Sequence, residues 1–207
     1  MIAIIDYGMG NLGSVRKALE CLGYRVEITS DPGTVDQAAG LILPGVGAFG
    51  DGYQGLADRG LVDVVRKAAQ SGRPFLGVCL GLQLLFEESE ESPGCPGLGI
   101  LPGRVVRFSP KEQTGLKVPH MGWNQITPVP GRVNPLLPAD CRPYVYFVHS
   151  YYAVPAREED VLAVCEYGVV FPAMAGRDNI FAVQFHPEKS QADGLAILER
   201  FARLTRS

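Results

Sequence analysis

One stretch decides the fold of this chain: Arg73-Pro-Phe-Leu-Gly-Val-Cys79-Leu-Gly81-Leu-Gln83-Leu-Leu-Phe86. Phe75–Val78 is a short apolar run after a Gly-Arg-Pro turn, which predicts a buried strand. Residues 80–88 are rich in helix formers with apolar side chains at helical spacing, which predicts a helix. Cys79 therefore lies on a sharp turn between a strand and a helix.

Glycines stand two residues before and two residues after Cys79, at positions 77 and 81. This is the Gly-x-nucleophile-x-Gly elbow, with Cys in place of Ser. Glycine suits it because the turn is strained and the helix must approach the strand closely. The helix dipole favours a thiolate there, and the backbone N–H of Leu80 can face an oxyanion. The alternative is a small, inert, buried Cys at a strand end; the paired glycines favour the nucleophile.

The bulk composition fits a single domain in a cytosolic setting. The 207 residues suit one domain over positions 1–207, and a net charge of −3 with mixed signs argues against a nucleic-acid surface. No apolar run approaches the roughly 20 residues that span a bilayer, and the N-terminus reads as a strand, not a signal peptide. The 5 cysteines include no C-x-x-C spacing, which argues against disulfides or a metal site and for a reducing environment.

A glycine-rich loop, Gly8-Met-Gly10-Asn-Leu-Gly13, follows the first predicted strand at residues 2–6. It matches G-x-G-x-x-G, and Asp31 follows the next strand at about the distance of a ribose-binding acid, so a dinucleotide site is one alternative. However, Asp6 and Tyr7 place a charge and a ring where such turns are apolar and tight. We therefore favour a loop shaped for close backbone contact with something other than a cofactor.

A second glycine-rich loop, Pro44-Gly45-Val46-Gly47, follows the apolar strand Gly40–Leu43. Loops at the carboxyl ends of parallel strands are where α/β folds bind ligands. Its N–H groups can complete an oxyanion hole, because glycine lets backbone approach a substrate closely. A mobile turn is the alternative.

The sequence pattern changes in the second half of the chain. The acidic cluster at residues 87–91 reads most simply as a solvated helix end, although a carboxylate so near Cys79 can also hold the ammonium of an amino-acid substrate. From residue 100, short β-rich runs alternate with Pro and Gly. Their spacing is too short for helical crossovers, which predicts antiparallel or mixed strands added to a parallel core. Residues 190–204 predict a closing amphipathic helix.

A base and its orienting acid stand together near the end of the chain. His186 and Glu188 are two residues apart, so on extended backbone they point to the same side, and Pro187 stiffens the link. A thiol nucleophile needs such a base, and the base needs an acid that holds its tautomer. His149 is the rival base, but it has no carboxylate nearby in sequence, so we favour His186.

The only tryptophan, Trp123, lies in Pro119-His-Met-Gly-Trp-Asn124, a loop-like setting beside Pro and Gly at the start of the β-rich run over residues 123–128. An exposed Trp is a typical interface anchor. A Trp half-buried at a sheet end is equally compatible with the sequence.

These motifs together resemble a known family. G-V-C-L-G at 77–81, P-G-V-G at 44–47 and H-P-E at 186–188 occur in the order of class I (triad) glutamine amidotransferases. More narrowly, D-Y-G-M-G-N-L-x-S at 6–14, P-H-M-G-W-N at 119–124, H-S-Y at 149–151 and F-H-P-E-K-S at 185–190 resemble the glutaminase subunits of imidazole glycerol phosphate synthase over essentially the whole chain. The resemblance to anthranilate synthase glutaminases is weaker, because it rests mainly on the elbow and H-P-E.

The resemblance implies a flavodoxin-like α/β fold, no metal or organic cofactor, and a triad of Cys79, His186 and Glu188. It implies that Cys79 attacks the carboxamide of glutamine and that His186, held by Glu188, protonates the departing ammonia. The family's oxyanion and substrate groups match these positions here: Gly45, Val46, Gly47, Leu80, Gln83, Glu91, Ser150 and Tyr151.

The resemblance also implies a partner. The ammonia would pass to a cyclase subunit, a (β/α)8 barrel, in a heterodimer that makes imidazole glycerol phosphate in histidine biosynthesis. Asn11, Trp123 and Lys189 match residues at or near that interface, which accounts for the first glycine-rich loop without a dinucleotide. A nicotinamide enzyme, an inactive binding module and a triad hydrolase of another amide remain the alternatives.

Overall fold

The computed structural model describes residues 1–109 and 116–206. Its elements follow the order β1 (Ile2–Ile5), α1 (Leu12–Cys21), β2 (Val26–Thr29), α2 (Pro32–Gln37), β3 (Gly40–Leu43), α3 (Phe49–Asp58), α4 (Val62–Gln70), β4 (Phe75–Val78), α5 (Leu80–Leu84), β5 (Glu88–Ser89), β6 (Gly103–Arg107), β7 (His120–Pro128), β8 (Tyr144–His149), β9 (Tyr151–Pro155), η1 (Glu158–Asp160), β10 (Val161–Glu166), β11 (Val170–Arg177), β12 (Ile180–Val183), η2 (Pro187–Lys189) and α6 (Gln191–Leu204). No helix in the described ranges is both long and apolar enough to cross a bilayer.

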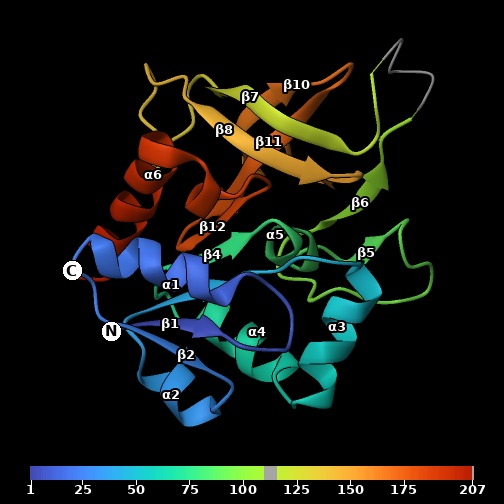
Figure 1. The fold of residues 1–207 in the computed structure, drawn as a ribbon. Coiled ribbons are helices and arrows are strands. Elements are labelled where there is room, and N and C mark those ends of the chain that lie inside the picture. The colour runs from blue at the N-terminus through green and yellow to red at the C-terminus, as the bar shows by residue number, and fades with distance from the viewer. Residues whose placement is uncertain (110–115, 207) are drawn as a thin grey trace.

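Most strands belong to one 9-stranded sheet with the order β2-β1-β3-β4-β12-β11-β10-β7-β8. The half from β2 to β12 is parallel, and the half from β12 to β8 is antiparallel. Figure 1 shows the parallel half surrounded by helices in the lower part of the molecule and the antiparallel half above it. A parallel core with antiparallel additions is what the sequence predicted.

Alternate residues of the parallel strands enter two different cores. Ile2 and Ile4 of β1 pack in the cluster that contains residues of α1 and α6. Ala3 and Ile5 pack in the cluster on the other face, with residues of α2 to α5. Because both faces are covered, these strands read as unbroken apolar runs, as parallel strands do.

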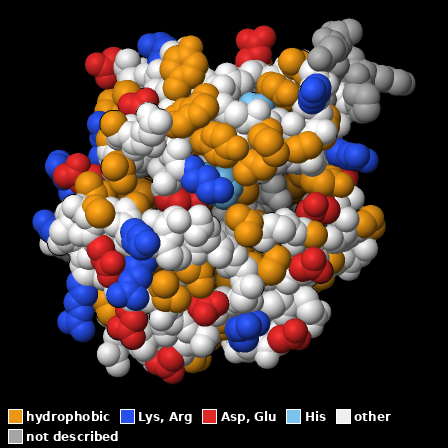
Figure 2. All heavy atoms as spheres, in the orientation of Figure 1, with side chains coloured by type: hydrophobic (Ala, Val, Ile, Leu, Met, Phe, Trp, Pro, Cys, Tyr) orange, Lys and Arg blue, Asp and Glu red, His pale blue; other side chains and the backbone are white. Residues whose placement is uncertain are grey.

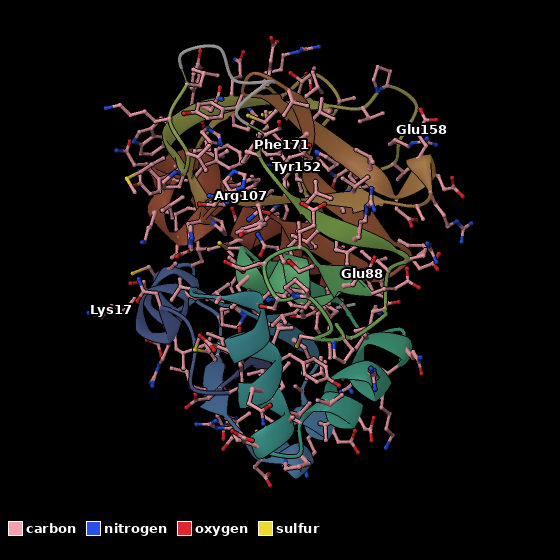
Figure 3. The ribbon with its side chains drawn as sticks, turned by 90° about the vertical axis from the view of Figure 1, so that its right-hand side faces the viewer. Lys17, Glu88, Arg107, Tyr152, Glu158 and Phe171 are labelled. Carbon is pink, nitrogen blue, oxygen red and sulfur yellow. The ribbon has the colours of Figure 1, made fainter. Side chains whose placement is uncertain are left out.

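Two parts of the fold differ from the sequence predictions. α3 was not expected, because its first residues, Phe49-Gly-Asp-Gly52, are typical of a loop; it is stabilised by packing, since Phe49, Gly52 and Leu56 are buried. The predicted helix over 80–88 ends at Leu84, and the acidic cluster is not a solvated helix end. Instead, β5, β6 and the unpredicted β9 form a 3-stranded sheet, visible beside Glu88 in Figure 3.

The topology brings four loops together. β1, β3, β4 and β12 are neighbours in the parallel half, so their carboxyl ends meet at one edge of the sheet. The first two residues after each of these strands include Tyr7, Gly45, Cys79 and Gln184. The candidate site is at this edge.

Candidate active site

Cys79 occupies a strained turn between β4 and α5. Its φ is 54° and its ψ is −107°, a left-handed conformation that residues with a Cβ rarely adopt. The glycines on either side permit close packing: a Cβ on Gly81 would collide with the carbonyl oxygen of Leu43, and one on Gly77 would lie 2.9 Å from the carbonyl oxygen of Gly81. The predicted elbow is therefore confirmed in geometry.

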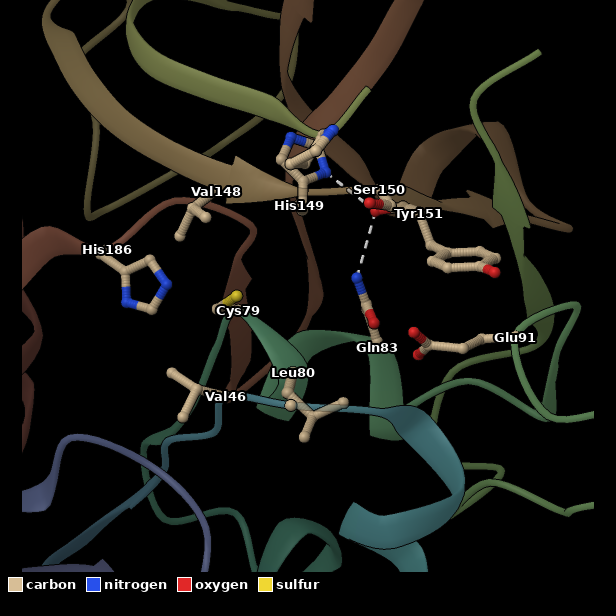
Figure 4. Close-up of a pocket in the computed structure, with 12 residues that line it drawn as sticks. Val46, Cys79, Leu80, Gln83, Glu91, Val148, His149, Ser150, Tyr151 and His186 are labelled. Carbon is tan, nitrogen blue, oxygen red and sulfur yellow. Dashed lines mark hydrogen bonds between the residues drawn. The ribbon is translucent and has the colours of Figure 1, made fainter. Parts of the chain in front are cut away.

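His186 and Glu188 form a buried pair beside that elbow. Nδ1 of His186 lies 2.9 Å from Oε1 of Glu188, and their side chains are 2% and 1% exposed. Burial lowers the pKa of His186, but the interactions with Cys79 and Glu188 outweigh burial and raise that pKa to about 10. Nε2 of His186 is buried without a hydrogen-bond partner among the described residues, and Figure 4 shows the ring beside Cys79. The imidazolium thus has one proton held by Glu188 and one available near the sulfur.

A cavity of about 300 Å³ opens beside the pair. Among the predicted site residues, its lining includes Val46, Gly47, Cys79, Leu80, Gln83, Glu91, Ser150, Tyr151 and His186. Pro119, Val148 and His149 complete it. Figure 4 shows the lining converging from α5, the 44–47 loop, the β8–β9 connection and the segment after β12. No group of three or more His, Cys, Asp or Glu side chains in the described ranges is placed to hold a metal ion.

Comparison with known proteins fits this geometry. The family model for glutamine amidotransferase class-I matches residues 3–204. The imidazole glycerol phosphate synthase subunit HisH of Moorella thermoacetica is 54% identical over 206 residues, covering 99% of this chain and 95% of that protein. The chain belongs to the class-I glutamine amidotransferase family. The HisH subunit of Geobacillus thermodenitrificans is 55% identical over 203 residues, covering 97% and 94%.

Solved structures agree with this amidotransferase assignment at the level of the fold. A crystal structure of a glutamine amidotransferase has a TM-score of 0.77 at 21% identity, with 100% of both chains covered. The structure of PurLQS from Thermotoga maritima has a TM-score of 0.75 at 19% identity, covering 98% of this chain and 97% of that one.

The oxyanion hole expected of an amidotransferase is not assembled in this structure. The N–H of Leu80, the predicted first donor, donates instead to the carbonyl oxygen of Gly45 at 3.4 Å. The 44–47 loop therefore presents a carbonyl where a second N–H donor was predicted. A bond this long is weak, so the loop can be displaced from Leu80 at small cost.

Tyr7 holds the start of this loop, and sequence reasoning missed it. Its hydroxyl donates to the carbonyl oxygen of Pro44 at 2.7 Å. Burial, with the charge of Cys79, raises the pKa of Tyr7 far above its ordinary value, so the hydroxyl keeps its proton. A Cβ on Gly45 would collide with that hydroxyl. Tyr7, whose bulky ring made a dinucleotide-binding turn less plausible in the sequence, therefore packs against the 44–47 loop.

The first glycine-rich loop, residues 8–13, also lies beside the 44–47 loop. A Cβ on Gly10 would lie 3.5 Å from the backbone of Gly45, an ordinary van der Waals distance, so the two loops are neighbours. Asp31, the expected ribose-binding acid of the dinucleotide alternative, accepts hydrogen bonds from the backbone and hydroxyl of Thr34 at the start of α2. Gly8 and Gly10 have positive φ values of 89° and 111°, which glycine adopts without strain, and a Cβ on Gly13 would meet nothing within 4 Å. The close backbone contact that the sequence analysis favoured for this loop stays a prediction.

Two predicted substrate residues are held by other parts of the site. Oε2 of Glu91 accepts a hydrogen bond from the N–H of Phe49, at the start of the unpredicted α3, at 2.8 Å. Nε2 of Gln83 donates to the carbonyl oxygen of Tyr151 at 3.1 Å and to Oε1 of Gln184 at 3.2 Å. Gln184 is fully buried and was not predicted; only its position after β12, beside the elbow strand, points to it.

The three predicted interface residues lie outside the cavity. Trp123 is 46% exposed on β7, which contains the predicted strand over residues 123–128 and begins three residues earlier, at His120. Lys189 and Asn11 are exposed, and Asn11 is the N-cap residue before α1, where its side chain makes no capping hydrogen bond. Figure 2 shows hydrophobic side chains gathered on the face over β7 and β8. Met121 and Trp123 on β7 and Tyr144 on β8 are exposed there.

Proposed function

We propose that this chain is the cytoplasmic glutaminase subunit of imidazole glycerol phosphate synthase. As one amidotransferase domain, it hydrolyses glutamine to glutamate and ammonia for histidine biosynthesis. The observation that carries the proposal is the buried His186–Glu188 pair beside the strained Cys79, in a chain 54% identical to a HisH subunit.

The reaction follows from the arrangement of the three side chains. The thiolate of Cys79 attacks the carboxamide carbon of glutamine and forms a tetrahedral intermediate. His186 gives its Nε2 proton to the amine as the C–N bond breaks, which releases ammonia and leaves a glutamyl thioester. The neutral ring then takes a proton from water, which attacks the thioester and regenerates the thiolate. Glu188 holds Nδ1–H throughout.

Stabilising the oxyanion requires a change in the 44–47 loop. The carbonyl of Gly45 must leave the N–H of Leu80 before that N–H can bind an oxyanion. Rotation of the Gly45–Val46 peptide removes this carbonyl and turns the N–H of Val46 towards the same place. Tyr7 fixes the preceding carbonyl, so the rotation is confined to one peptide. Glutamine itself is held at its amino-acid end by Gln83, Glu91 and the Ser150–Tyr151 segment.

The partner in this proposal is a cyclase subunit with a (β/α)8 barrel. The two subunits form a heterodimer, and the cyclase uses the ammonia to make imidazole glycerol phosphate and an aminoimidazole carboxamide ribonucleotide. Exposed Trp123 and the neighbouring apolar side chains of β7 and β8 support a protein contact on this face. Asn11 and Lys189 extend the proposed contact.

The direct test measures ammonia release from glutamine by the protein alone and with the cyclase barrel and its nucleotide substrate. Low activity alone and a strong increase with the barrel are expected, because the oxyanion donor at Leu80 is occupied in the isolated chain. An equal rate in both settings would contradict the pairing, and stimulation only by another synthase, such as the anthranilate synthase partner, would reassign the chain.

Trp123→Ala is expected to weaken the barrel complex by about 2 kcal/mol, because large aromatic side chains dominate protein interfaces. The Kd measured by titration calorimetry should rise roughly thirtyfold, while Cys79 reacts normally with an alkylating reagent. Val133→Ala is the matched control, since Val133 is 91% exposed in the β7–β8 connection. An unchanged Kd for Trp123→Ala would count against the interface.

Tyr7→Phe is expected to lower the unfolding free energy by about 1 kcal/mol, because the Pro44 carbonyl loses its hydroxyl donor. Because the start of the 44–47 loop is then no longer held, the barrel-stimulated kcat should fall several-fold with little change in KM. Tyr53→Phe, on the partly exposed side of α3, is the control. Wild-type stability and kcat in Tyr7→Phe would show that the hydroxyl does not position the loop.

A further inference from the structure

Two of the 3 histidines of this chain form a buried pair that the triad does not use. Nδ1 of His120 lies 3.0 Å from Nε2 of His149, and Nδ1 of His149 lies 2.8 Å from the carbonyl oxygen of Tyr151. The two residues are 3% and 6% exposed. Aromatic rings pack against them, including Phe108, Phe147, Tyr167 and Phe171. Tyr152 packs in turn against Phe108 and Phe171; Tyr152 and Phe171 are marked in Figure 3.

The partners fix the proton on each ring. A carbonyl oxygen only accepts, so Nδ1 of His149 must carry the proton that it shares with Tyr151. Burial lowers the pKa of His149 to about 3 and that of His120 to about 4, so both rings are neutral at pH 7. Nε2 of His149 is therefore an acceptor, and Nδ1–H of His120 donates to it. Nε2 of His120 then faces the side-chain amide of Asn124 at 3.5 Å.

The same carbonyl oxygen of Tyr151 also fixes the side-chain amide orientations of two glutamines, Gln83 and Gln184. Only an N–H can face it, so the amide of Gln83 has one allowed orientation. Nε2 of Gln83 also faces Gln184, which must present Oε1 to it. The amide N–H of Gln184 is thereby directed to Sγ of Cys79, at 3.8 Å. Figure 4 shows the convergence of His149 and Gln83 on the Tyr151 backbone.

We propose that His120 and His149 are positioning residues for Cys79, acting through a hydrogen-bonded chain of Tyr151 carbonyl, Gln83 and Gln184. The proposal rests on the proposed role of Cys79 as nucleophile. A donor at a sulfur stabilises its thiolate, and this donor keeps its direction only while the Tyr151 carbonyl stays in place. His149 holds that carbonyl, and His120 holds His149.

The series of hydrogen bonds also extends beyond His120, to Asn124. Nδ2 of Asn124 donates to the carbonyl oxygen of Glu166 at 2.9 Å, which ties this end to β10. Asn124 directly follows Trp123 on β7, the strand proposed to contact the barrel. A shift of β7 on binding therefore reaches the thiol through successive hydrogen bonds rather than through the substrate.

The test measures alkylation of Cys79 by iodoacetamide against pH, with peptide mass spectrometry separating it from Cys21, Cys95 and Cys141. His149→Phe removes both hydrogen bonds and keeps a ring of similar size. We expect its alkylation profile to move to higher pH and its rate at pH 7 to fall on the order of fivefold. His149→Asn keeps an N–H near the Tyr151 carbonyl and should stay close to wild type.

Two further variants separate hydrogen bonding from packing. Gln184→Met removes the amide at the sulfur and should reproduce the His149→Phe profile, and the double variant should add nothing, because both act through one chain. Phe108→Leu, which disturbs the aromatic rings around both histidines without removing a hydrogen bond of the chain, should alkylate as wild type does.

An unshifted profile in folded His149→Phe would overturn the proposal, as would an equal shift in Phe108→Leu. If His149→Phe does not fold, the same alkylation measurement is made on His120→Phe and Gln184→Met. Unchanged reactivity of Cys79 in both variants would overturn the proposal. The readout needs neither glutamine nor a partner. Absence of glutaminase activity in the wild type would therefore refute the proposed function while leaving this result separately readable.

Discussion

Cys79→Ala is expected to abolish ammonia release from glutamine, lowering kcat by a factor of at least about 10⁴, because no other group supplies the covalent step. The fold should survive. Alanine has the same Cβ at the same strained φ of 54°, so the elbow is no more strained than before. The unfolding free energy should change by less than about 1 kcal/mol, since only one sulfur atom is lost. Coupled ammonia assays and urea denaturation measure both quantities.

Two other variants test that result. Cys165→Ala removes a buried thiol from β10, outside the cavity, and should retain full activity. Cys79→Gly should be as inactive as Cys79→Ala but more stable by about 1 kcal/mol, because glycine accepts a positive φ without strain. Glutaminase activity of Cys79→Ala close to that of wild type in the presence of the barrel would refute the mechanism.

The parts of the site that the sequence predicted are those with a local pattern. The elbow places a strand, a nucleophile and a helix within a few residues. Its glycines indicate that the helix packs closely, and Gly81 does lie against the backbone of β3. His186 and Glu188 are two residues apart, so their pairing is local, but the predicted extended strand end is wrong: β12 ends at Val183, and Glu188 lies in the 3-10 turn η2 that follows His186. Neither prediction needed the order of strands in the sheet.

The parts that were missed depend on that order. Tyr7 meets Pro44 only because β1 and β3 are adjacent, and Gln184 reaches Cys79 only because β12 inserts beside β4. Single-sequence patterns do not give the insertion of the last strand into the parallel half. The 80–88 helix was predicted too long for a related reason: the small sheet that takes up Glu88 and Ser89 is closed by β6 and β9, which follow later in the chain.

Glu188→Gln is expected to lower kcat for glutamine hydrolysis on the order of 10²- to 10³-fold, with a smaller change in KM. The glutamine oxygen can still accept the Nδ1–H of His186, but without the negative charge the pKa of His186 should fall from about 10. Less imidazolium is then present to protonate ammonia. In a plot of kcat against pH, the falling limb at high pH should therefore move to lower pH in the variant.

The same pair gives a second, independent expectation for stability. The folded pKa of His186, about 10, lies above its ordinary value of 6.5. The interactions of His186 with Cys79 and Glu188 therefore contribute their full stability below about pH 6.5, and this stability is lost as the pH rises through 10. The urea midpoint of Glu188→Gln should accordingly lie well below that of wild type at pH 6 and approach it near pH 10. Glu199→Gln, which breaks an exposed ion pair with Arg203 on α6, should change neither activity nor this pH dependence. A Glu188→Gln variant with a wild-type falling limb would show that the carboxylate does not hold the charge of His186, and general-acid catalysis would then have to be assigned to another group.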